Sequence, residues 1–204
     1  MSNKQIKNND MTLSVLSAVE ADSRVTQRSL SNELGIALGL TNSYIKKCID
    51  KGLVKIQQVP ANRYAYYLTP MGFTEKSRLT AEYFKASFSF YKRAKNDLTN
   101  LMATCVKKKL CNIILSDASE LAEIAIIISF SSDINLVGIL GNSNLKNING
   151  IPIKKNINSF NKYDLIIITN IQDSQSRYKE LTQLVSKEKI IIPDVLKYKK
   201  GVNK

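Results

Sequence analysis

Apolar residues recur at helical spacing in three stretches of the N-terminal part of the chain. The spacing predicts helices over about 10–21, 26–34 and 37–51, each separated from the next by a short polar or glycine-containing turn. Asp10 and Thr26 are suited to cap the first two helices, because a short oxygen-bearing side chain can accept a hydrogen bond from a first-turn amide. The predicted arrangement is three short helices in succession.

The third of these predicted helices has two unlike sides. At about 100° per residue, one side is largely apolar and contains Leu38, Thr41, Ile45, Cys48 and Ile49. The other side is small, polar and basic and contains Gly39, Leu40, Ser43, Lys46, Lys47 and Asp50. A short helix, a tight turn and a helix of this kind are typical of a helix-turn-helix, whose second helix lies in the DNA major groove.

Two strand-like segments follow, over 53–59 and 63–68, on either side of a turn formed by Pro60, Ala61 and Asn62. This pattern predicts a hairpin, and a hairpin directly after a recognition helix is a wing. Arg63 lies beside its tip, where an arginine can reach a phosphate or the minor groove. The N-terminal region, 10–69, is therefore predicted to be a winged helix-turn-helix domain.

The predicted DNA contacts come from the exposed side of the third helix, the wing and the start of the second helix. Gly39 and Ser43 would allow close approach to base edges, and Lys46 and Lys47 would reach phosphates or guanine acceptors. Asn42 lies on the flank of the apolar side, so a base contact and a structural hydrogen bond are equally open. The full predicted set is Arg24, Gln27, Arg28, Gly39, Leu40, Asn42, Ser43, Lys46, Lys47 and Arg63.

A long helix is predicted over 70–109, opened by Thr69 and Pro70 and free of proline or glycine after Phe73. Aromatic and aliphatic residues repeat along it at roughly seven-residue spacing, which is typical of a coiled-coil seam. We expect homodimerisation through Phe84, Phe88, Tyr91, Leu98 and Leu101. Packing of the same face within one chain is the alternative.

Short Ile-rich runs alternate with helical patterns over 110–204. The predicted strands are 111–115, 135–140, 165–169 and 190–192, with helices over 119–129 and 174–186 and a short edge strand near 150–153. This alternation predicts a small α/β domain of the Rossmann-like, parallel-sheet kind. The predicted fold class is thus an α+β winged helix-turn-helix domain, a long connecting helix and an α/β domain.

The turn after the first strand of that domain is the expected place for a ligand. It lacks the glycines of a dinucleotide-binding turn, and Asp117 and Glu120 would repel phosphate. The candidate ligand loop consists of Ser116, Ala118, Ser119 and Gly141. No cofactor is predicted, and both weak nucleotide binding and a purely structural or dimerising role stay open.

Composition limits the chemistry further. The 204 residues contain no histidine and three cysteines, and the net charge is +13. Catalytic pairs and metal sites that use histidine are therefore excluded, and we expect no catalytic residue, no metal and no enzyme activity. Residues 1–109 carry 18 basic and 8 acidic side chains, so most of the excess charge lies in this first part of the chain, which comprises the predicted winged helix and the long helix. A soluble cytoplasmic protein with no membrane segment and double-stranded DNA as its partner is predicted.

Several sequence runs resemble those of MarR-type winged-helix regulators associated with exopolysaccharide gene clusters. The runs are Thr26–Gly35, Leu38–Asn42, Asp50–Lys55 and Tyr67–Lys76, within a resemblance that covers about Asp10 to Asp97. Ala37 stands where these proteins usually have a capping serine, and Leu40 where a basic residue is common. The resemblance implies a bacterial or archaeal transcriptional regulator, accompanied by a Rossmann-like nucleotide or sugar-nucleotide domain.

These observations favour a dimeric, sequence-specific DNA-binding regulator with a degenerate Rossmann-like domain for regulation or assembly. An NAD(H)- or nucleotide-sugar-responsive repressor is the alternative. A nucleotide-sugar enzyme with an accessory winged helix is the third reading, but the tyrosine and lysine spacings near the second domain do not suit it. A small-molecule effector is possible in principle, and the sequence does not specify one.

Overall fold

The computed structural model describes residues 3–59 and 63–197. The chain divides into two compact units, Met1–Ser87 and Phe88–Lys204, and the division falls within the long helix predicted over 70–109. None of the helices in the described residues combines the length and apolarity that crossing a lipid bilayer requires.

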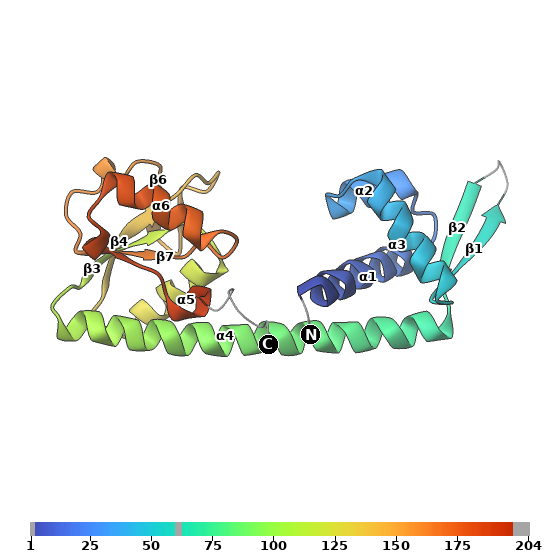
Figure 1. Cartoon of the computed structure of the whole chain (residues 1–204), viewed down its shortest axis with the longest axis horizontal. Helices are drawn as coiled ribbons and strands as arrows, with labels where there is room; N and C mark the ends of the chain where they lie inside the picture. Colours follow the sequence, from blue (N-terminus) through green and yellow to red (C-terminus); the bar gives the residue numbers. More distant parts are fainter. Residues whose placement is uncertain (1–2, 60–62, 198–204) are drawn as a thin grey trace. The chain divides into compact units, whose positions relative to one another are not determined.

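The first unit contains three helices and a hairpin, followed by the start of a long helix (Figure 1). The elements are α1 (Asn3–Ala21), α2 (Gln27–Leu34), α3 (Leu38–Asp50), β1 (Val54–Val59), β2 (Arg63–Leu68) and α4 (Pro70–Lys107). Strands β1 and β2 pair in antiparallel register, with Val54 opposite Leu68 and Val59 opposite Arg63. Val15, Leu16, Leu30, Ile45 and Tyr66 lie in a shared apolar core. This is the predicted winged helix-turn-helix.

The prediction that Asp10 caps the first helix is wrong. Helix α1 begins at Asn3, and Asp10 lies inside it. The first turns are polar and contain no proline or glycine to stop a helix. The Thr12 hydroxyl donates to the carbonyl of Asn8 and the Ser14 hydroxyl to that of Asp10. Hydrophobic spacing could not detect these turns because they carry no regular apolar positions.

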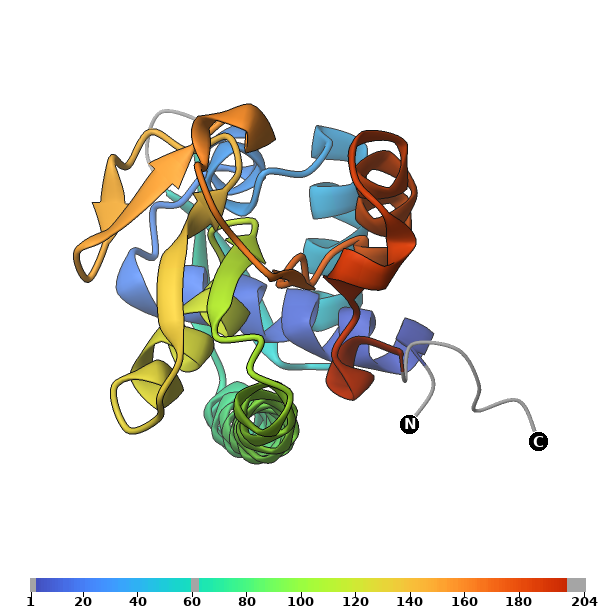
Figure 2. The same cartoon turned by 90° about the vertical axis from the view of Figure 1, so that its left-hand side faces the viewer.

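The second unit is an α/β domain whose sheet has the strand order β5-β6-β4-β3-β7-β8. All neighbouring strands are parallel except β5 and β6. The strands are β3 (Asn112–Ser116), β4 (Asn135–Leu140), β5 (Asn147–Ile148), β6 (Ile151–Lys154), β7 (Leu165–Ile168) and β8 (Ile190–Ile191). The helices are α5 (Glu120–Ser129), α6 (Ser174–Leu184) and α7 (Asp194–Lys197), with single 3₁₀ turns at Ile157–Ser159 and Lys187–Lys189. Figure 2 shows α5 and α6 on opposite sides of the sheet.

The strand near 150–153 is a second correction. It was expected at the edge, but β6 lies between β4 and the two-residue strand β5. Asn149 and Gly150 both have positive φ, at 49° and 83°, and they turn the chain tightly enough for β5 to pair with β6. An Asn-Gly pair is typical of a two-residue β-hairpin turn, so Asn149 and Gly150 indicated this hairpin in the sequence.

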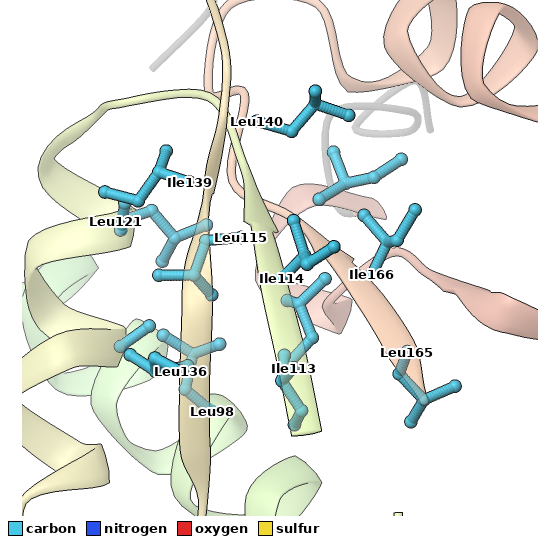
Figure 3. Close-up of a cluster of buried hydrophobic side chains, with 14 of the residues drawn as sticks. Leu98, Ile113, Ile114, Leu115, Leu121, Leu136, Ile139, Leu140, Leu165 and Ile166 are labelled. Atoms are coloured by element: carbon cyan, nitrogen blue, oxygen red, sulfur yellow. The ribbon is translucent and has the colours of Figure 1, made fainter. Parts of the chain in front are cut away.

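The core of the second unit is built from the apolar strands and the helices that cover them (Figure 3). Ile113, Ile114, Leu115, Ile166 and Ile167 are 0% exposed, as expected for strands of a parallel sheet with both faces covered. Ala94, Leu98, Met102 and Cys105 of α4 belong to the same core. This packing fixes the carboxyl ends of β3, β4 and β7, where the candidate ligand loop lies.

Candidate nucleic-acid interface

Helix α2 is held at both ends by the residues predicted to do so. Thr26 Oγ1 accepts the Ser29 amide at 3.0 Å, and Ser29 Oγ accepts the Thr26 amide at 2.9 Å, which completes a reciprocal capping box. At the other end Gly35 adopts φ 61°, and the Ile36 amide donates to the Ser31 carbonyl at 3.1 Å. The left-handed glycine ends α2 and starts the tight turn into α3.

One apolar side of helix α3 packs against the core of the first unit. Thr41, Ile45 and Cys48 are 0%, 4% and 2% exposed, as predicted. Burial raises the pKa of the Cys48 thiol to about 11, so this cysteine is a core residue and not a reactive one. Leu38 was placed on the same side but is 41% exposed, because it is the first residue of the helix and extends beyond the core.

The opposite side of α3 faces away from the core. Gly39, Leu40, Ser43, Lys46 and Asp50 are exposed, and Lys47 is half-buried with its Nζ 5.8 Å from the centre of the Tyr44 ring. A Cβ added to Gly39 would meet no atom within 4 Å, so packing inside the chain does not require this glycine. The small surface there is open to a partner.

The first turn of α3 also has unpaired backbone amides. Ala37 occupies the N-cap position in an extended conformation and provides no side-chain hydrogen bond, and no acidic residue lies in the first turn. The Leu40 amide donates to the Ala37 carbonyl at 3.0 Å, so the Leu38 and Gly39 amides and the positive end of the helix dipole are what this helix start offers to an anion. A DNA phosphate is an anion of this kind.

Asn42 is half-buried, and its Oδ1 is a buried atom without a hydrogen-bond partner. The predicted alternative of a structural hydrogen bond to this oxygen is thus not formed within the described residues. A buried, unpaired amide oxygen costs free energy, about 1 to 3 kcal/mol by mutational data. A rotamer that turned the amide outward would relieve this cost.

The other predicted contacts have different surroundings. Arg24 is exposed and its Nε lies 3.3 Å from Asp22 Oδ1, while the Arg24 amide, at 2.9 Å, is the main cause of the lowered pKa of Asp22. Gln27 Nε2 donates to the Tyr66 hydroxyl at 3.4 Å, which joins α2 to the wing. Arg28 is exposed. The Arg63 side chain and the turn at 60–62 lie outside the described residues.

Three residues that were not predicted as site residues position the wing. The Tyr66 amide donates to the Ser23 carbonyl at 2.8 Å, which adds the loop before α2 to the edge of β2. The Thr69 hydroxyl donates to the Gly52 carbonyl at 2.6 Å and accepts the Gly72 amide at 3.0 Å. A Cβ on Gly72 would lie 2.0 Å from the Leu53 carbonyl oxygen. The Thr-Pro-x-Gly run therefore fits the start of α4 closely against the wing.

The predicted dimerisation seam does not form one exposed face. Phe84, Phe88 and Tyr91 are 55%, 64% and 40% exposed. Leu98 is 0% exposed in the core of the second unit, and Leu101 packs partly buried against that core. The assignment of Leu98 to a dimer interface was wrong, because the helical spacing that marks a seam equally marks a face that covers a sheet.

The side chains of the candidate ligand loop are engaged in contacts within the chain. Asp117 adopts φ 79°, the conformation that a glycine would favour, and Gly141 approaches so closely that an added Cβ would lie 3.3 Å from the Asp117 Cα. Ser116 is 0% exposed, and its Oγ accepts a hydrogen bond from Arg177 Nε at 2.8 Å. Ser119 caps α5, because its Oγ accepts the Ala122 amide while donating to the Thr169 carbonyl. Ala118 lies between them, half-buried.

Arg177 of α6 holds this loop in place from the neighbouring helix. Its guanidinium, on a side chain that is 14% exposed, lies 3.0 Å from Asp117 Oδ2 and donates to the Leu140 carbonyl at 3.1 Å. A cavity of about 490 Å³ remains at the carboxyl ends of the strands. It is lined by the acidic side chains of Asp117, Glu120 and Glu123 and by no lysine or arginine of the described residues. In those residues no group of three or more His, Cys, Asp or Glu side chains is placed to hold a metal ion.

Comparison with known proteins identifies the N-terminal region. A family model described as winged helix-turn-helix DNA-binding matches residues 8–55, which contain most of α1 together with α2, α3 and the start of β1. The first unit therefore contains a winged helix-turn-helix DNA-binding domain. No curated protein sequence matches the chain.

One solved structure, of the archaeal chromatin protein TrmBL2, covers 87% of this chain and 68% of its own, with 15% sequence identity and a TM-score of 0.25. That structure is described as showing a novel mode of DNA binding. A TM-score this low supports no conclusion about the fold or function of the present chain.

Proposed function

We propose that this protein is a sequence-specific DNA-binding transcriptional regulator, similar to the MarR-type winged-helix proteins that its N-terminal motifs resemble. One observation carries the proposal. Helix α3 has a buried apolar side, an exposed basic and polar side and an uncapped N-terminus, within a region that matches winged helix-turn-helix DNA-binding domains. These are the properties of a recognition helix in the major groove.

The proposed contacts divide into two kinds. Lys46 and Lys47, together with Arg24, Arg28 and Arg63, would neutralise phosphates and position the domain. Ser43 and Asn42 would read base edges, Asn42 after a rotation that frees its unpaired Oδ1 for adenine. Gly39 and Leu40 would lie against the groove, where a small residue allows close approach and an apolar one can contact a thymine methyl group.

We propose that the regulator acts as a homodimer. A single winged helix contacts one half-site, and a symmetric pair of half-sites raises both affinity and specificity. Phe84, Phe88 and Tyr91 repeat at i, i+4 and i+7 on α4 and remain exposed, which suits them to a helix-to-helix contact. Leu98 is left out of this proposal because it is already buried.

We propose that the α/β domain serves regulation or assembly and not catalysis. Numbered along the chain, its parallel strands lie in the order 3-2-1-4-5, which is the order found in Rossmann-like sheets. The Arg177–Asp117 ion pair and the acidic lining of the cavity oppose binding of a dinucleotide. As a DNA-binding transcriptional regulator, the protein would act in the cytoplasm.

Selection of genomic DNA fragments on the purified full-length protein, at two salt concentrations, tests this proposal. We expect fragments that share a site with two-fold symmetry, retained at the higher salt concentration. Recovery of fragments without a shared site, or loss of all fragments at the higher salt concentration, would contradict sequence-specific regulation. Recovery of a shared site without symmetry would contradict the dimer.

A further inference from the structure

The part of α4 that belongs to the second unit has one side packed on the α/β core and one side exposed. Ala94, Leu98, Met102 and Cys105 lie in that core. At about 100° per residue, the opposite side of the helix covers a sector of about 120°. All residues of this sector, which we call the outer face of α4, are exposed; they are Lys92, Arg93, Asn96, Thr99, Asn100, Ala103 and Lys107.

The outer face and its borders are basic. Residues 88–109 contain six basic side chains, the three of the outer face together with Lys95, Lys108 and Lys109, and one acidic side chain, Asp97. The Asp97 carboxylate is engaged elsewhere, because its Oδ2 accepts the Val195 amide of α7 at 2.8 Å. Within the described part of the chain, none of the six basic side chains forms an ion pair.

The helix itself does not explain where these charges lie. The helix dipole stabilises a cation in the last turn, which accounts for Lys107. The effect of the dipole is confined to the terminal turns, so it does not account for Lys92 and Arg93, which lie about four turns before the end. Helix α5 of the same unit has the opposite charge, because its exposed residues include Glu120 and Glu123 and it contains no lysine or arginine. The positive charge is therefore concentrated on one helix face.

We propose that the outer face of α4 is a second DNA-binding surface, which contacts the phosphates of a duplex without reading its sequence. Lysine, arginine, asparagine and threonine side chains all donate hydrogen bonds to phosphates. The outer face consists of these four types and one alanine. Lys92 and Lys107 are separated by about 22 Å along the helix, more than the about 12 Å width of the major groove, so the two lysines can contact phosphates on both sides of it.

The composition of the outer face argues against two other classes of partner. A helix that lies on an anionic membrane buries large apolar side chains, and a protein interface has aromatic or aliphatic residues at its centre. The largest apolar residue of the outer face is Ala103. A duplex fits, because phosphate contacts need positive charge and hydrogen-bond donors but no apolar surface. The choice of DNA as the polyanion rests on the proposed function, whereas the surface itself is separate from α3.

Fluorescence anisotropy of the full-length protein on a duplex that lacks the selected site tests this surface. Lys92→Gln/Arg93→Gln/Lys107→Gln removes three charges from the outer face and keeps residues that favour a helix. We expect binding to weaken at least tenfold, and the slope of log affinity against log salt to fall by about 3, one for each lost phosphate contact.

The matched control, Lys155→Gln/Lys179→Gln/Lys187→Gln, removes the same charge from exposed positions of the same unit outside α4 and should keep the full slope. An unchanged slope in the outer-face variant, or an equal loss in both variants, would overturn the surface. Stronger competition by duplex RNA than by duplex DNA of the same length would overturn the choice of DNA.

A second background separates this surface from α3. In the Lys46→Ala/Lys47→Ala protein, the outer-face substitutions should still lower the slope by about 3, and no additional loss there would overturn an independent surface. Failure of the unmodified protein to prefer a selected fragment over the site-free duplex would count against the proposed function alone.

Sedimentation velocity should give the same oligomeric state for the outer-face variant and the unmodified protein. Lys92 is next to Tyr91 of the proposed dimer contact. If its replacement changes the oligomeric state, Arg93→Gln/Lys107→Gln/Lys108→Gln takes the place of the first variant, and the same loss of slope is expected. An unchanged slope in this second variant would overturn the surface.

Discussion

Two helices of this protein begin at tight turns, and their N-termini differ in the side-chain cap and in the charge of the first turn. Helix α3 follows Gly35 and begins at Ala37, which gives no side-chain cap, and its first turn contains no acidic residue. Helix α5 follows Asp117, is capped by Ser119 and has Glu120 and Glu123 in its first turn. In each helix the third amide is bonded within the chain, Leu40 to the Ala37 carbonyl and Ala122 to Ser119 Oγ. The two starts therefore differ in charge: the first turn of α3 can receive an anion, whereas the acidic first turn of α5 repels one.

The difference shows why a parallel sheet in this order does not by itself indicate a dinucleotide site. Anion binding at a helix start needs free amides and a backbone that a phosphate can approach. In the α/β unit the Asp117 carboxylate lies in the turn and is held by Arg177. The helix start that has neither a side-chain cap nor an acidic first turn is that of α3 in the first unit, on the side that the proposed function assigns to DNA.

The largest expected effect on stability comes from removing Arg177, which holds the turn at Asp117. Arg177→Leu would leave the Asp117 carboxylate and the buried Ser116 hydroxyl without their main partner, and we expect the free energy of unfolding to fall by about 2–4 kcal/mol. Urea denaturation measures it. Lys197→Ala removes only the exposed pair with Asp194 and should cost less than about 0.5 kcal/mol. If the two variants lose similar stability, the turn is not held closed by Arg177.

A smaller loss is expected from removing the cap of α5. Ser119→Ala deletes the acceptor for the Ala122 amide and the donor to the Thr169 carbonyl, and should lower the free energy of unfolding by about 1–2 kcal/mol. Ser143→Ala is a suitable control, because Ser143 lines the same cavity but caps no helix. Equal effects of the two substitutions in urea denaturation would argue against the cap.

Adding a cap to α3 sharpens the comparison. Ala37→Asn and Ala37→Asp should both stabilise the protein, by about 1 kcal/mol, because either side chain can accept a first-turn amide. Only the aspartate places a negative charge where a phosphate is proposed to lie, so only Ala37→Asp should weaken DNA binding, by several-fold. Thermal unfolding and fluorescence anisotropy separate the two effects. Equal DNA affinities of the two variants would show that no phosphate approaches this helix start.

Local sequence features predicted the parts of the fold that depend on local interactions. The Thr26 cap, the Gly35 turn and the apolar side of α3 are all encoded within a few residues, and the structure has them where they were predicted. The closure of the ligand loop was not predictable in the same way, because Arg177 is 61 residues from Ser116 in sequence. Nothing near Arg177 marks it as a partner of the first turn.

The periodicity of α4 was informative but ambiguous for a physical reason. Apolar residues three, four and seven apart line one side of any helix, whether that side meets another helix or a sheet. Leu98 covers the α/β core, while Tyr91 and Phe88, about two and three turns earlier, do not. Only tertiary structure distinguishes these cases.

The smallest expected effect is the response of the α/β unit to a dinucleotide. Calorimetric titration of the full-length protein with NADH, up to millimolar concentration, should give no measurable binding, because the cavity is acidic and the Asp117 turn blocks the close approach of pyrophosphate. Micromolar binding would contradict this expectation. It would make the NAD(H)-responsive repressor the better proposal.

The most direct test of DNA binding by α3 is the salt dependence of affinity for a selected DNA fragment, measured by fluorescence anisotropy. Lys46→Ala/Lys47→Ala is compared with Lys155→Ala/Lys179→Ala, which removes the same charge from exposed positions of the α/β unit. Each lost phosphate contact should reduce the slope of log affinity against log salt by about 1, so we expect the first variant to lose about 2 and the second to keep the full slope. Equal slopes in the two variants would contradict the assignment of DNA binding to this helix.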